Sequence, residues 1–306
     1  MKRVLLTGAS GFIGSQSLPH LIRRGYEVHA ITYRNLPGNH NGIHWHRVDL
    51  LNSHIVHDVL FEIAPTHLLH FAWYAEPGKY QQAAQNSEWC RAGMTLLRDF
   101  AASGGRRAVF AGTCLEYDLS YGYCSEASTP CVPVTPYGAS KFALAQMVAG
   151  LPPAGVSTAW GRIFHLYGPG EHPSRLVASV IRSLLRNEPA HCTHGHQVRD
   201  FTHVSDIASA FVALLDSAVE GIVNVGSGKP VSIRTLVLTI AELIGAPDLV
   251  TFGAIATPPN DPPLLIPNSS RIRDQLGWAP RWALSEGLAH TVDWWRTNSV
   301  GTNAQA

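Results

Sequence analysis

The strongest constraint on the fold is a glycine-rich turn near the N-terminus. The apolar run 4–6 leads directly into the segment Thr7-Gly8-Ala9-Ser10-Gly11-Phe12-Ile13-Gly14. Glycine permits a positive φ and a close approach of the backbone to a phosphate, and the N–H groups at the start of a helix attract an anion. The segment therefore predicts a strand, a turn that binds the pyrophosphate of a dinucleotide, and a helix. The residues expected at this pyrophosphate are Gly8, Gly11, Phe12, Ile13 and Gly14.

Strand and helix patterns alternate after this turn. Further strands are predicted over residues 27–32, 44–48, 67–71, 107–111 and 157–163. Helices are predicted over residues 53–63, 81–102 and 137–151. Regular alternation is typical of the α/β class, so we expect a doubly wound parallel Rossmann sheet.

The pattern of predicted elements changes after Gly168-Pro169-Gly170, where the elements become shorter and the connections between them become rich in proline. This change predicts a smaller C-terminal α/β lobe that binds the substrate. We expect a dinucleotide-binding domain over residues 1–165, with a return segment at about 198–226, and a mainly substrate-binding lobe over 166–306. The substrate is expected in the cleft between the lobes, beyond the carboxyl ends of the strands.

Composition and charge argue against several classes of partner. The 306 residues carry a formal net charge of +1, which indicates neither a nucleic-acid nor a membrane-surface partner. The apolar run after Lys2-Arg3 is too short for a signal peptide, and no run is long enough to span a bilayer. Five cysteines form no C-x-x-C pair, so reduced thiols are expected and the cytoplasm is the predicted location.

Two short runs contain alternating metal-binding side chains. One run holds His191, Cys192, His194 and His196, and the other holds His44 and His46. Alternate residues of a strand share one face, as a metal site would require. Neither run has an evident further ligand or supporting carboxylate, so we expect no metal site.

A tyrosine and a lysine lie four residues apart at the start of the helix predicted after Thr135-Pro136. Tyr137 and Lys141 therefore share one helix face. A nearby cation lowers the pKa of a phenol from about 10 toward neutrality, which makes tyrosine a usable acid and base for a carbonyl oxygen. Thr113, at the end of a preceding strand, is placed to donate a second hydrogen bond to that oxygen.

Several other motifs follow one another in a familiar order. They are Asp49-Leu50, Leu69-His70-Phe71-Ala72, Thr113 with Tyr117, Arg199-Asp200-Phe201-x-His203-Val204-x-Asp206, and Leu276-Gly277-Trp278-x-Pro280. Together with the glycine turn and the Tyr137/Lys141 pair, they resemble the extended short-chain dehydrogenase/reductase family, in its branch that modifies nucleotide sugars. The resemblance covers most of the chain.

The resemblance implies roles for the matching residues at the reaction centre and the cofactor. Tyr137 is expected to donate or accept the proton, Lys141 to bind the nicotinamide ribose, and Thr113 to hold the reacting oxygen. The residues expected to flank the adenine are Asp49 and Leu50, and those expected along the middle of the cofactor are Phe71, Ala72 and Trp73.

The substrate residues match the family less completely. Arg199 matches an arginine that contacts the substrate diphosphate, with a lobe-bridging ion pair as the alternative. His165 replaces an asparagine that usually bonds the substrate, and a second diphosphate arginine expected shortly before Asp261 is absent. Cys114 either lines the sugar pocket or packs as a small thiol. Arg175 stands where epimerase–reductases of the fucose pathway need a histidine, so double epimerisation is disfavoured.

Dehydration is also disfavoured. Sugar-nucleotide 4,6-dehydratases carry Asp and Glu directly after the threonine, whereas Cys114 and Leu115 occupy those positions here. Glu116 is one residue out of register, and one step along a strand turns a side chain to the opposite face.

The end of the second strand bears on the choice of cofactor. Relatives that use NAD have an acidic residue where this chain has Thr32, and Arg34 follows two residues later. This favours NADP(H), because a 2′-phosphate meets no carboxylate and gains an arginine, with NAD as the alternative.

The expected function is NADP(H)-dependent reduction, or the reverse oxidation, at C4 of a nucleotide-linked 4-keto-6-deoxy sugar. One alternative is a nucleotide-sugar 4-epimerase that retains NAD, and another is a non-catalytic sensor that binds a dinucleotide. A homodimer is expected, built from the helices predicted over residues 81–102 and 137–151.

Overall fold

The larger sheet of the molecule is parallel and is wound outward in both directions from its first strand. The computed structural model describes residues 2–33, 36 and 42–299. Within these residues the strand order is β11-β7-β5-β4-β1-β2-β3. The strands are β1 (Arg3–Thr7), β2 (Glu27–Thr32), β3 (Ile43–Arg47), β4 (His67–His70), β5 (Arg107–Thr113), β7 (Ser157–Ile163) and β11 (Gly221–Val225). This order confirms the predicted doubly wound Rossmann sheet.

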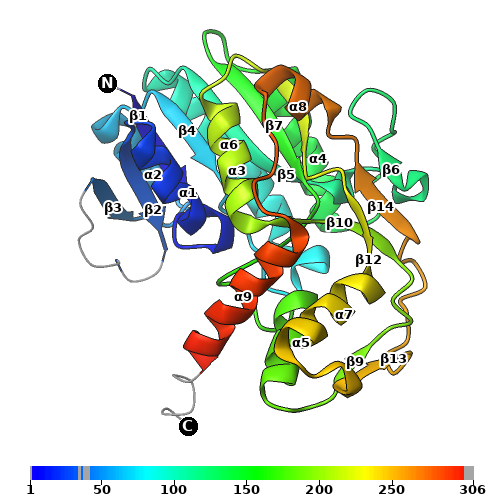
Figure 1. Ribbon diagram of the computed structural model, residues 1–306. Coiled ribbons are helices and arrows are strands. Elements are labelled where there is room, and N and C mark those ends of the chain that lie inside the picture. The colour runs from blue at the N-terminus through cyan, green and yellow to red at the C-terminus, as the bar shows by residue number, and fades with distance from the viewer. Residues whose placement is uncertain (1, 34–35, 37–41, 300–306) are drawn as a thin grey trace.

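Helices cover both faces of this sheet (Figure 1). On one face α1 (Phe12–Arg23) packs beside α6 (Val204–Leu215), and on the other lie α2 (Ser53–Ile63), α3 (Asn86–Ala102) and α4 (Pro136–Ala145). The buried residues of α2, Val56, Leu60 and Ile63, recur every three or four positions and so form a single apolar stripe. This periodicity explains why the sequence forms a helix here and which face it buries.

Two predicted helices have different limits in the structure. The helix predicted from residue 81 begins at Asn86, because the side-chain amide of Asn86 donates to the carbonyls of Tyr80 and Ala83 and holds a preceding turn, η1 (Tyr80–Gln82). The helix predicted over 137–151 ends as α4 at Ala145 and continues as one π-helical turn. Its predicted start is confirmed, since the Thr135 hydroxyl accepts from the Gly138 N–H at 3.1 Å.

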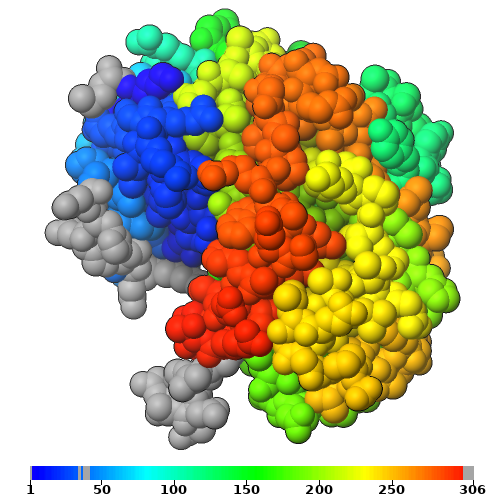
Figure 2. All heavy atoms as spheres, in the orientation of Figure 1, coloured from blue at the N-terminus to red at the C-terminus, as the bar shows by residue number. Residues whose placement is uncertain are grey.

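The C-terminal part of the chain, together with the short strand β6 from its first half, forms a smaller, separate layer structure. Its strands are β6 (Tyr123–Cys124), β8 (His165–Tyr167), β9 (Ala190–Cys192), β10 (Val198–His203), β12 (Pro230–Ser232), β13 (Val250–Phe252) and β14 (Leu264–Pro267). Its helices are α5 (Leu176–Leu185), α7 (Ile233–Ile244) and α9 (Leu284–Ser299), whereas α8 (Ser270–Leu276) packs against the core of the large sheet. The apolar faces of α5, α7 and α9 share one core, and Figure 2 shows α9, in red, beside α7, in yellow. The predicted smaller C-terminal lobe is therefore present.

The chain returns to the large sheet after entering this smaller lobe. From β10, which lies in the smaller sheet, it passes into α6 and then β11, which pairs with β7 at the edge of the large sheet. The buried face of α6, which includes Ile207, Ala210 and Phe211, forms part of the core beneath β1 and β5. None of the helices in the described ranges combines the length and the apolar character needed to cross a bilayer.

Candidate active site

The glycine-rich turn connects β1 to α1. Gly8 has a φ of +68°, and its carbonyl accepts from the Gly11 N–H at 2.9 Å. Among the described residues, no side chain caps α1 at Gly11, and the first turn of α1 contains no acidic residue. The first N–H groups of α1 therefore remain available to an anion, which the positive end of the helix attracts.

The turn also packs closely against the end of β4. A Cβ on Gly8 would lie 2.9 Å from the Ala72 nitrogen, and a Cβ on Gly14 would lie 2.1 Å from the Gly8 carbonyl oxygen. The Thr7 hydroxyl accepts from the Ala72 N–H at 3.3 Å and joins the two strand ends. The predicted pyrophosphate residues thus lie beside Phe71 and Ala72, which were predicted to line the middle of the cofactor.

Gly14→Ala should disturb this turn, because its new methyl group meets backbone that cannot rotate away. We expect the free energy of unfolding to fall by about 1–3 kcal/mol and dinucleotide binding to weaken about tenfold or more. Urea unfolding and a fluorescence titration with NADH measure the two effects. Gly150→Ala is the matched control, since no described atom lies within 4 Å of its Cβ. Wild-type affinity in Gly14→Ala would contradict the assignment.

The three residues predicted to carry the chemistry meet at the carboxyl end of β5. A Cβ on Gly138 would lie 2.4 Å from the Leu115 carbonyl oxygen, so the start of α4 packs tightly on the turn after β5. Tyr137 is there within hydrogen-bonding reach of Thr113. One helical turn on, Lys141 is 3% exposed, and its Nζ donates to the Ala111 carbonyl at 2.9 Å.

Two aromatic side chains from the loop after β4 close over this group. The Lys141 Nζ lies 3.8 Å from the centre of the Trp73 ring, and the Tyr80 ring meets the Tyr137 ring edge to face at 4.8 Å. Asn86 fixes both, because it accepts from the Trp73 indole N–H at 2.8 Å and donates to the Tyr80 carbonyl at 2.7 Å. The sequence analysis missed Tyr80, whose only signal was the aromatic character of this loop.

The expected effect of Lys141 on the acidity of Tyr137 is wrong for this structure. Burial raises the pKa of Tyr137 above its usual value, and the hydrogen bond with Thr113 opposes this only in part. Burial lowers the pKa of Lys141 to about 7, although Glu116 favours the charged form. The physical reason is distance and environment: the ammonium lies 6.0 Å from the Tyr137 ring and donates to a backbone carbonyl instead.

Glu116 has a structural position that the sequence did not reveal. β5 ends at Thr113 and a short 3₁₀ turn follows, so the argument from strand register does not apply to this residue. The fully buried Glu116 carboxylate accepts from the Thr113 backbone N–H at 2.8 Å and from the Trp160 indole at 2.9 Å. Its other oxygen pairs with Arg162 at 2.7 Å. The ion pair thereby supports Thr113 from inside the protein.

Cys114 is packed against apolar neighbours. It is 6% exposed and shares a small core with Tyr117, Cys124 and Phe164. Burial raises the pKa of the Cys114 thiol to about 12, so the thiol stays neutral. These observations favour the packed thiol over the sugar-pocket interpretation.

The polar residues predicted for the substrate lie in the smaller lobe. Arg199 is 3% exposed and donates to Asp261 at 2.6 Å, so this ion pair lies within the smaller lobe and does not bridge the two lobes. His165 on β8 lies opposite Phe201 on β10, and its Nδ1 has no partner among the described residues. Burial and then Arg199 lower the pKa of His165 to about 4, so its imidazole is neutral near pH 7.

Arg175 connects this polar region to the reaction centre. It is exposed at the N-terminus of α5, and its guanidinium lies 5.3 Å from the centre of the Tyr80 ring. Since Tyr80 also contacts Tyr137, the predicted substrate residue Arg175 and the predicted catalytic residue Tyr137 are joined through a single side chain.

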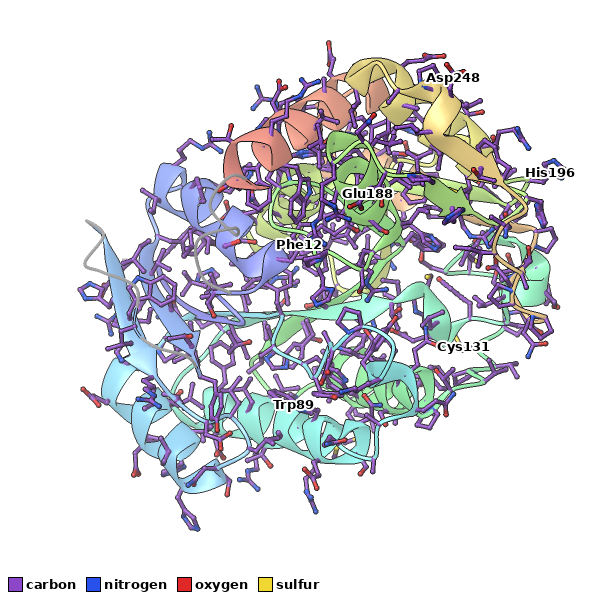
Figure 3. All side chains as sticks on the ribbon, turned by 90° about the horizontal axis from the view of Figure 1, so that it is seen from below. Phe12, Trp89, Cys131, Glu188, His196 and Asp248 are labelled. Atoms are coloured by element: carbon purple, nitrogen blue, oxygen red, sulfur yellow. The ribbon has the colours of Figure 1, made fainter. Side chains whose placement is uncertain are left out.

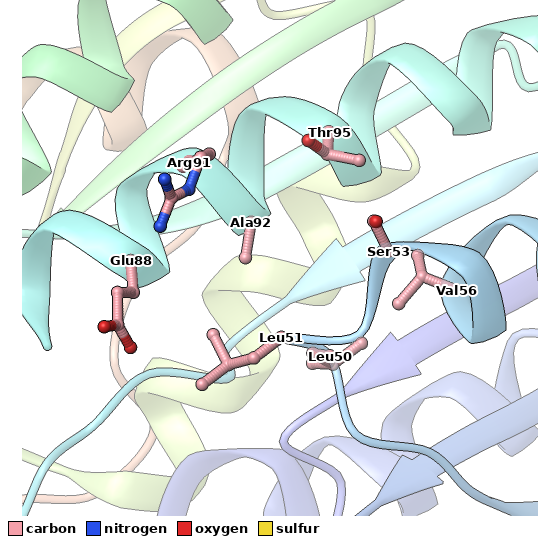
Figure 4. Close-up of a pocket in the computed structure, with 8 residues that line it drawn as sticks. All are labelled: Leu50, Leu51, Ser53, Val56, Glu88, Arg91, Ala92 and Thr95. Carbon is pink, nitrogen blue, oxygen red and sulfur yellow. The ribbon is translucent and has the colours of Figure 1, made fainter.

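The predicted adenine end is described only in part. Thr32, at the end of β2, is 2% exposed and hydrogen bonds Ser10, whereas the Arg34 prediction lies outside the described residues. Asp49 accepts from the Leu51 N–H at 3.0 Å. Leu50 lines a cavity of about 290 Å³ between the start of α2 and α3 (Figure 4).

The histidine run in the C-terminal half does not form the alternating strand that its spacing suggested. β9 ends at Cys192, which is buried, whereas His191, His194 and His196 are exposed. Figure 3 places His196 at the outer rim of the molecule. The strand argument for a shared face therefore fails here.

Comparisons with known proteins agree with this geometry. The model of the NAD dependent epimerase/dehydratase family matches residues 4–226. The UDP-glucose 4-epimerase of Azospirillum brasilense is 27% identical, covering 99% of this chain and 94% of that protein. The dTDP-glucose 4,6-dehydratase of Xanthomonas campestris pv. campestris strain ATCC 33913 is 29% identical, covering 97% of this chain and 93% of that protein.

Two solved structures are also similar. MoeE5 in complex with UDP-glucuronic acid and NAD has a TM-score of 0.83 and 32% identity, covering 96% of this chain and 99% of that one. The Thermus thermophilus UDP-glucose 4-epimerase in complex with NAD has a TM-score of 0.79 and 27% identity, covering 97% of this chain and 99% of that one.

Proposed function

Because this chain belongs to the NAD-dependent epimerase/dehydratase family of nucleotide-sugar enzymes, we propose that it is a 4-epimerase that retains NAD and acts on a nucleotide-linked hexose. The observation that carries the proposal is the convergence of Thr113, Tyr137 and Lys141 at the end of β5, with Cys114 and Leu115 where a dehydratase has carboxyl groups. These three residues can move a proton at C4, but they include no carboxylic acid that could assist the elimination of water.

The residues around the glycine-rich turn fit a dinucleotide. The uncapped start of α1 suits the pyrophosphate, and the close approach of Gly14 to Gly8 leaves the turn free of side chains. Asp49 and Leu50 would hold the adenine, Phe71, Ala72 and Trp73 would line the middle, and Lys141 would bind the nicotinamide ribose. A bound NAD would supply the hydride acceptor and donor for C4 of the sugar, and these residues would hold it in place.

Tyr137 and Thr113 handle the proton that accompanies each hydride. As the C4 hydroxyl is oxidised, its proton passes to the Tyr137 phenolate, and in the reverse step Tyr137 returns a proton to the oxygen at C4. The Thr113 hydroxyl holds that oxygen. Burial disfavours the phenolate, and Lys141 does not offset this cost here, because its ammonium lies 6.0 Å from the Tyr137 ring and donates to the Ala111 carbonyl. Trp73 and Tyr80 exclude water from the same place.

Arg199 is proposed to bind the diphosphate of the substrate, with His165 and Arg175 on the sugar side. Relatives in the comparisons carry UDP-sugars, and a guanidinium binds phosphate oxygens in a bidentate manner. Arg199→Leu should raise KM for the nucleotide sugar about tenfold or more and change kcat little, because the lost contact is the same in ground and transition states. Steady-state kinetics measures this, with the exposed Arg186→Leu as control. An unchanged KM would count against the assignment.

A second candidate is the NADP(H)-dependent 4-ketoreductase. The buried Thr32 favours it, because no carboxylate stands at the end of β2 to accept from ribose hydroxyls. The epimerase is preferred because the relatives named above include epimerases and NAD complexes.

The cofactor content of the purified protein separates the two candidates. An epimerase should release about one equivalent of NAD on denaturation and interconvert UDP-glucose and UDP-galactose, or the corresponding uronic acids, with no net change in reduced nicotinamide. A ketoreductase should be purified empty and consume NADPH with a nucleotide 4-keto sugar. If neither activity occurs while NAD is bound, the proposed reaction is wrong.

We also propose a homodimer through α3 and the π-helical turn that follows α4. Met94, Met147 and Leu151 are 40%, 37% and 70% exposed, and they line one groove with Leu97. Such an apolar groove on two adjacent helices suits a second copy of the chain. Light scattering after size exclusion should give twice the mass of the chain, and Met94→Glu should give the single mass.

A further inference from the structure

A cluster of three histidines and one glutamate lies on the edge of the large sheet formed by β2 and β3 (Figure 1). His29 and Glu27 alternate along β2, and His44 and His46 alternate along β3. The register places His29 directly opposite His44. The four side chains therefore share one face, and β2 supplies the further ligand and the carboxylate that the His44/His46 spacing lacked in the sequence.

The side chains of this cluster contact one another closely. The His29 Nε2 lies 3.0 Å from the Glu27 Oε1, and the His29 Nδ1 lies 2.9 Å from the His46 Nε2. The rings of His29 and His44 stack with centroids 4.8 Å apart. One ligand atom from each of Glu27, His29 and His44 lies within 4.8 Å of the other two.

These separations suit a single metal ion. Two ligands that are each about 2.1 Å from one ion lie roughly 3.0–3.4 Å apart. Glu27 and His29 already have this spacing, and a ring nitrogen of the exposed His44 lies within 4.8 Å of both. In the structure the His29 Nε2–H donates to the Glu27 carboxylate, and His29 Nδ1 accepts from His46 Nε2. A metal ion at Nε2 would displace this proton, and His46 would then accept from the Nδ1–H and orient the His29 ring.

We propose that Glu27, His29 and His44 bind one divalent transition-metal ion such as Zn²⁺, with water completing the coordination and His46 orienting the His29 ring. Imidazole and carboxylate ligands together suit this class of ion. Glu27 lies level with Arg3 at the amino end of β1, whereas the cofactor turn follows the carboxyl end. The metal is therefore structural: it fastens the edge strand β3 to β2.

The charges around the cluster allow this binding but limit its strength. The Arg3 guanidinium donates to the Glu27 Oε1 at 3.1 Å and competes for the same oxygen. Glu62 adds negative charge near His46. We therefore expect micromolar affinity.

Calorimetric titration of the chelator-treated full chain with Zn²⁺ tests the proposal. We expect one equivalent to bind at a micromolar Kd, and His44→Gln to weaken it at least tenfold, since His44 is exposed and its replacement leaves the core intact. A double variant, His194→Gln with His196→Gln, removes another close histidine pair, whose ring centroids lie 4.9 Å apart, and should bind as wild type does. Saturating Zn²⁺ should raise the Tm of wild type but not of His44→Gln.

Titration with Co²⁺ identifies the ligands independently. A visible spectrum without the thiolate charge-transfer band should appear in wild type and be lost in His44→Gln. A thiolate band would assign the ion to cysteine and overturn the proposal. So would equal Zn²⁺ affinity in wild type and His44→Gln, or loss of binding in the double control variant. None of these measurements depends on the proposed enzymatic activity.

Discussion

Tyr137→Phe should lower turnover about 10³-fold, because it removes the only group at C4 proposed to accept and return the proton. The aromatic ring remains, so the edge-to-face contacts with Trp73 and Tyr80 persist. We therefore expect NAD content and KM to change by less than about threefold, with the loss confined to kcat. Steady-state epimerisation assays and denaturation-released NAD measure the two quantities.

Tyr80→Phe is the matched control for this substitution. It keeps the same ring contact on Tyr137 and loses a hydroxyl that accepts from Gln81 at 3.2 Å. Turnover within about threefold of wild type is expected, since the hydroxyl has no proposed role in the chemistry. If Tyr137→Phe turned over substrate as fast as Tyr80→Phe, Tyr137 would not be the acid and base.

Arg162→Leu should destabilise the protein by about 3–5 kcal/mol, because it leaves the Glu116 carboxylate charged, buried and without its partner. Arg162 and Glu116 are 3% and 0% exposed, so water cannot replace the lost guanidinium. The Glu116 carboxylate also holds the Thr113 N–H, so the end of β5 should loosen and activity should fall with stability. Urea unfolding followed by tryptophan fluorescence measures the change.

A second substitution separates the charge effect from a simple loss of packing. Glu116→Gln added to Arg162→Leu removes the buried charge and keeps an oxygen for the Thr113 and Trp160 N–H groups, so it should restore about half or more of the lost stability. The exposed pair Arg186–Glu188 is the control, and Arg186→Leu should cost less than about 1 kcal/mol. If the losses in unfolding free energy from the Arg162 and Glu116 substitutions simply added up, the ion pair would not be what supports this turn.

Local periodicity predicted most of the large sheet and its helices. The limits of β2, α2 and β7 agree with the prediction to the residue, because α2 buries one apolar stripe and the two strands are mostly buried runs. The start of α3 was wrong because Asn86 bonds the carbonyls of the preceding loop, a contact that no periodic pattern encodes.

The residues of the candidate site show the same difference between those that local sequence predicts and those that depend on tertiary contacts. Thr113, Tyr137 and Lys141 were predicted because their spacing and flanking residues carry the motif within short segments. Tyr80 and the burial of Glu116 depend on how separate segments meet, as does the pairing of His29 with His44. The expected lowering of the Tyr137 pKa failed for this reason as well, since sequence gives the spacing of charges but not their desolvation.

The return of the chain through α6 and β11 constrains how the protein can be made. During synthesis, a nascent chain that has emerged only as far as β7 lacks α6, which covers one face of the sheet, and β11, which pairs with its edge. Until then the apolar face and an unpaired strand edge are open to other chains. The large sheet therefore cannot complete its fold until α6 and β11 have been synthesised. A single cut after residue 165 should yield a fragment that aggregates instead of folding independently.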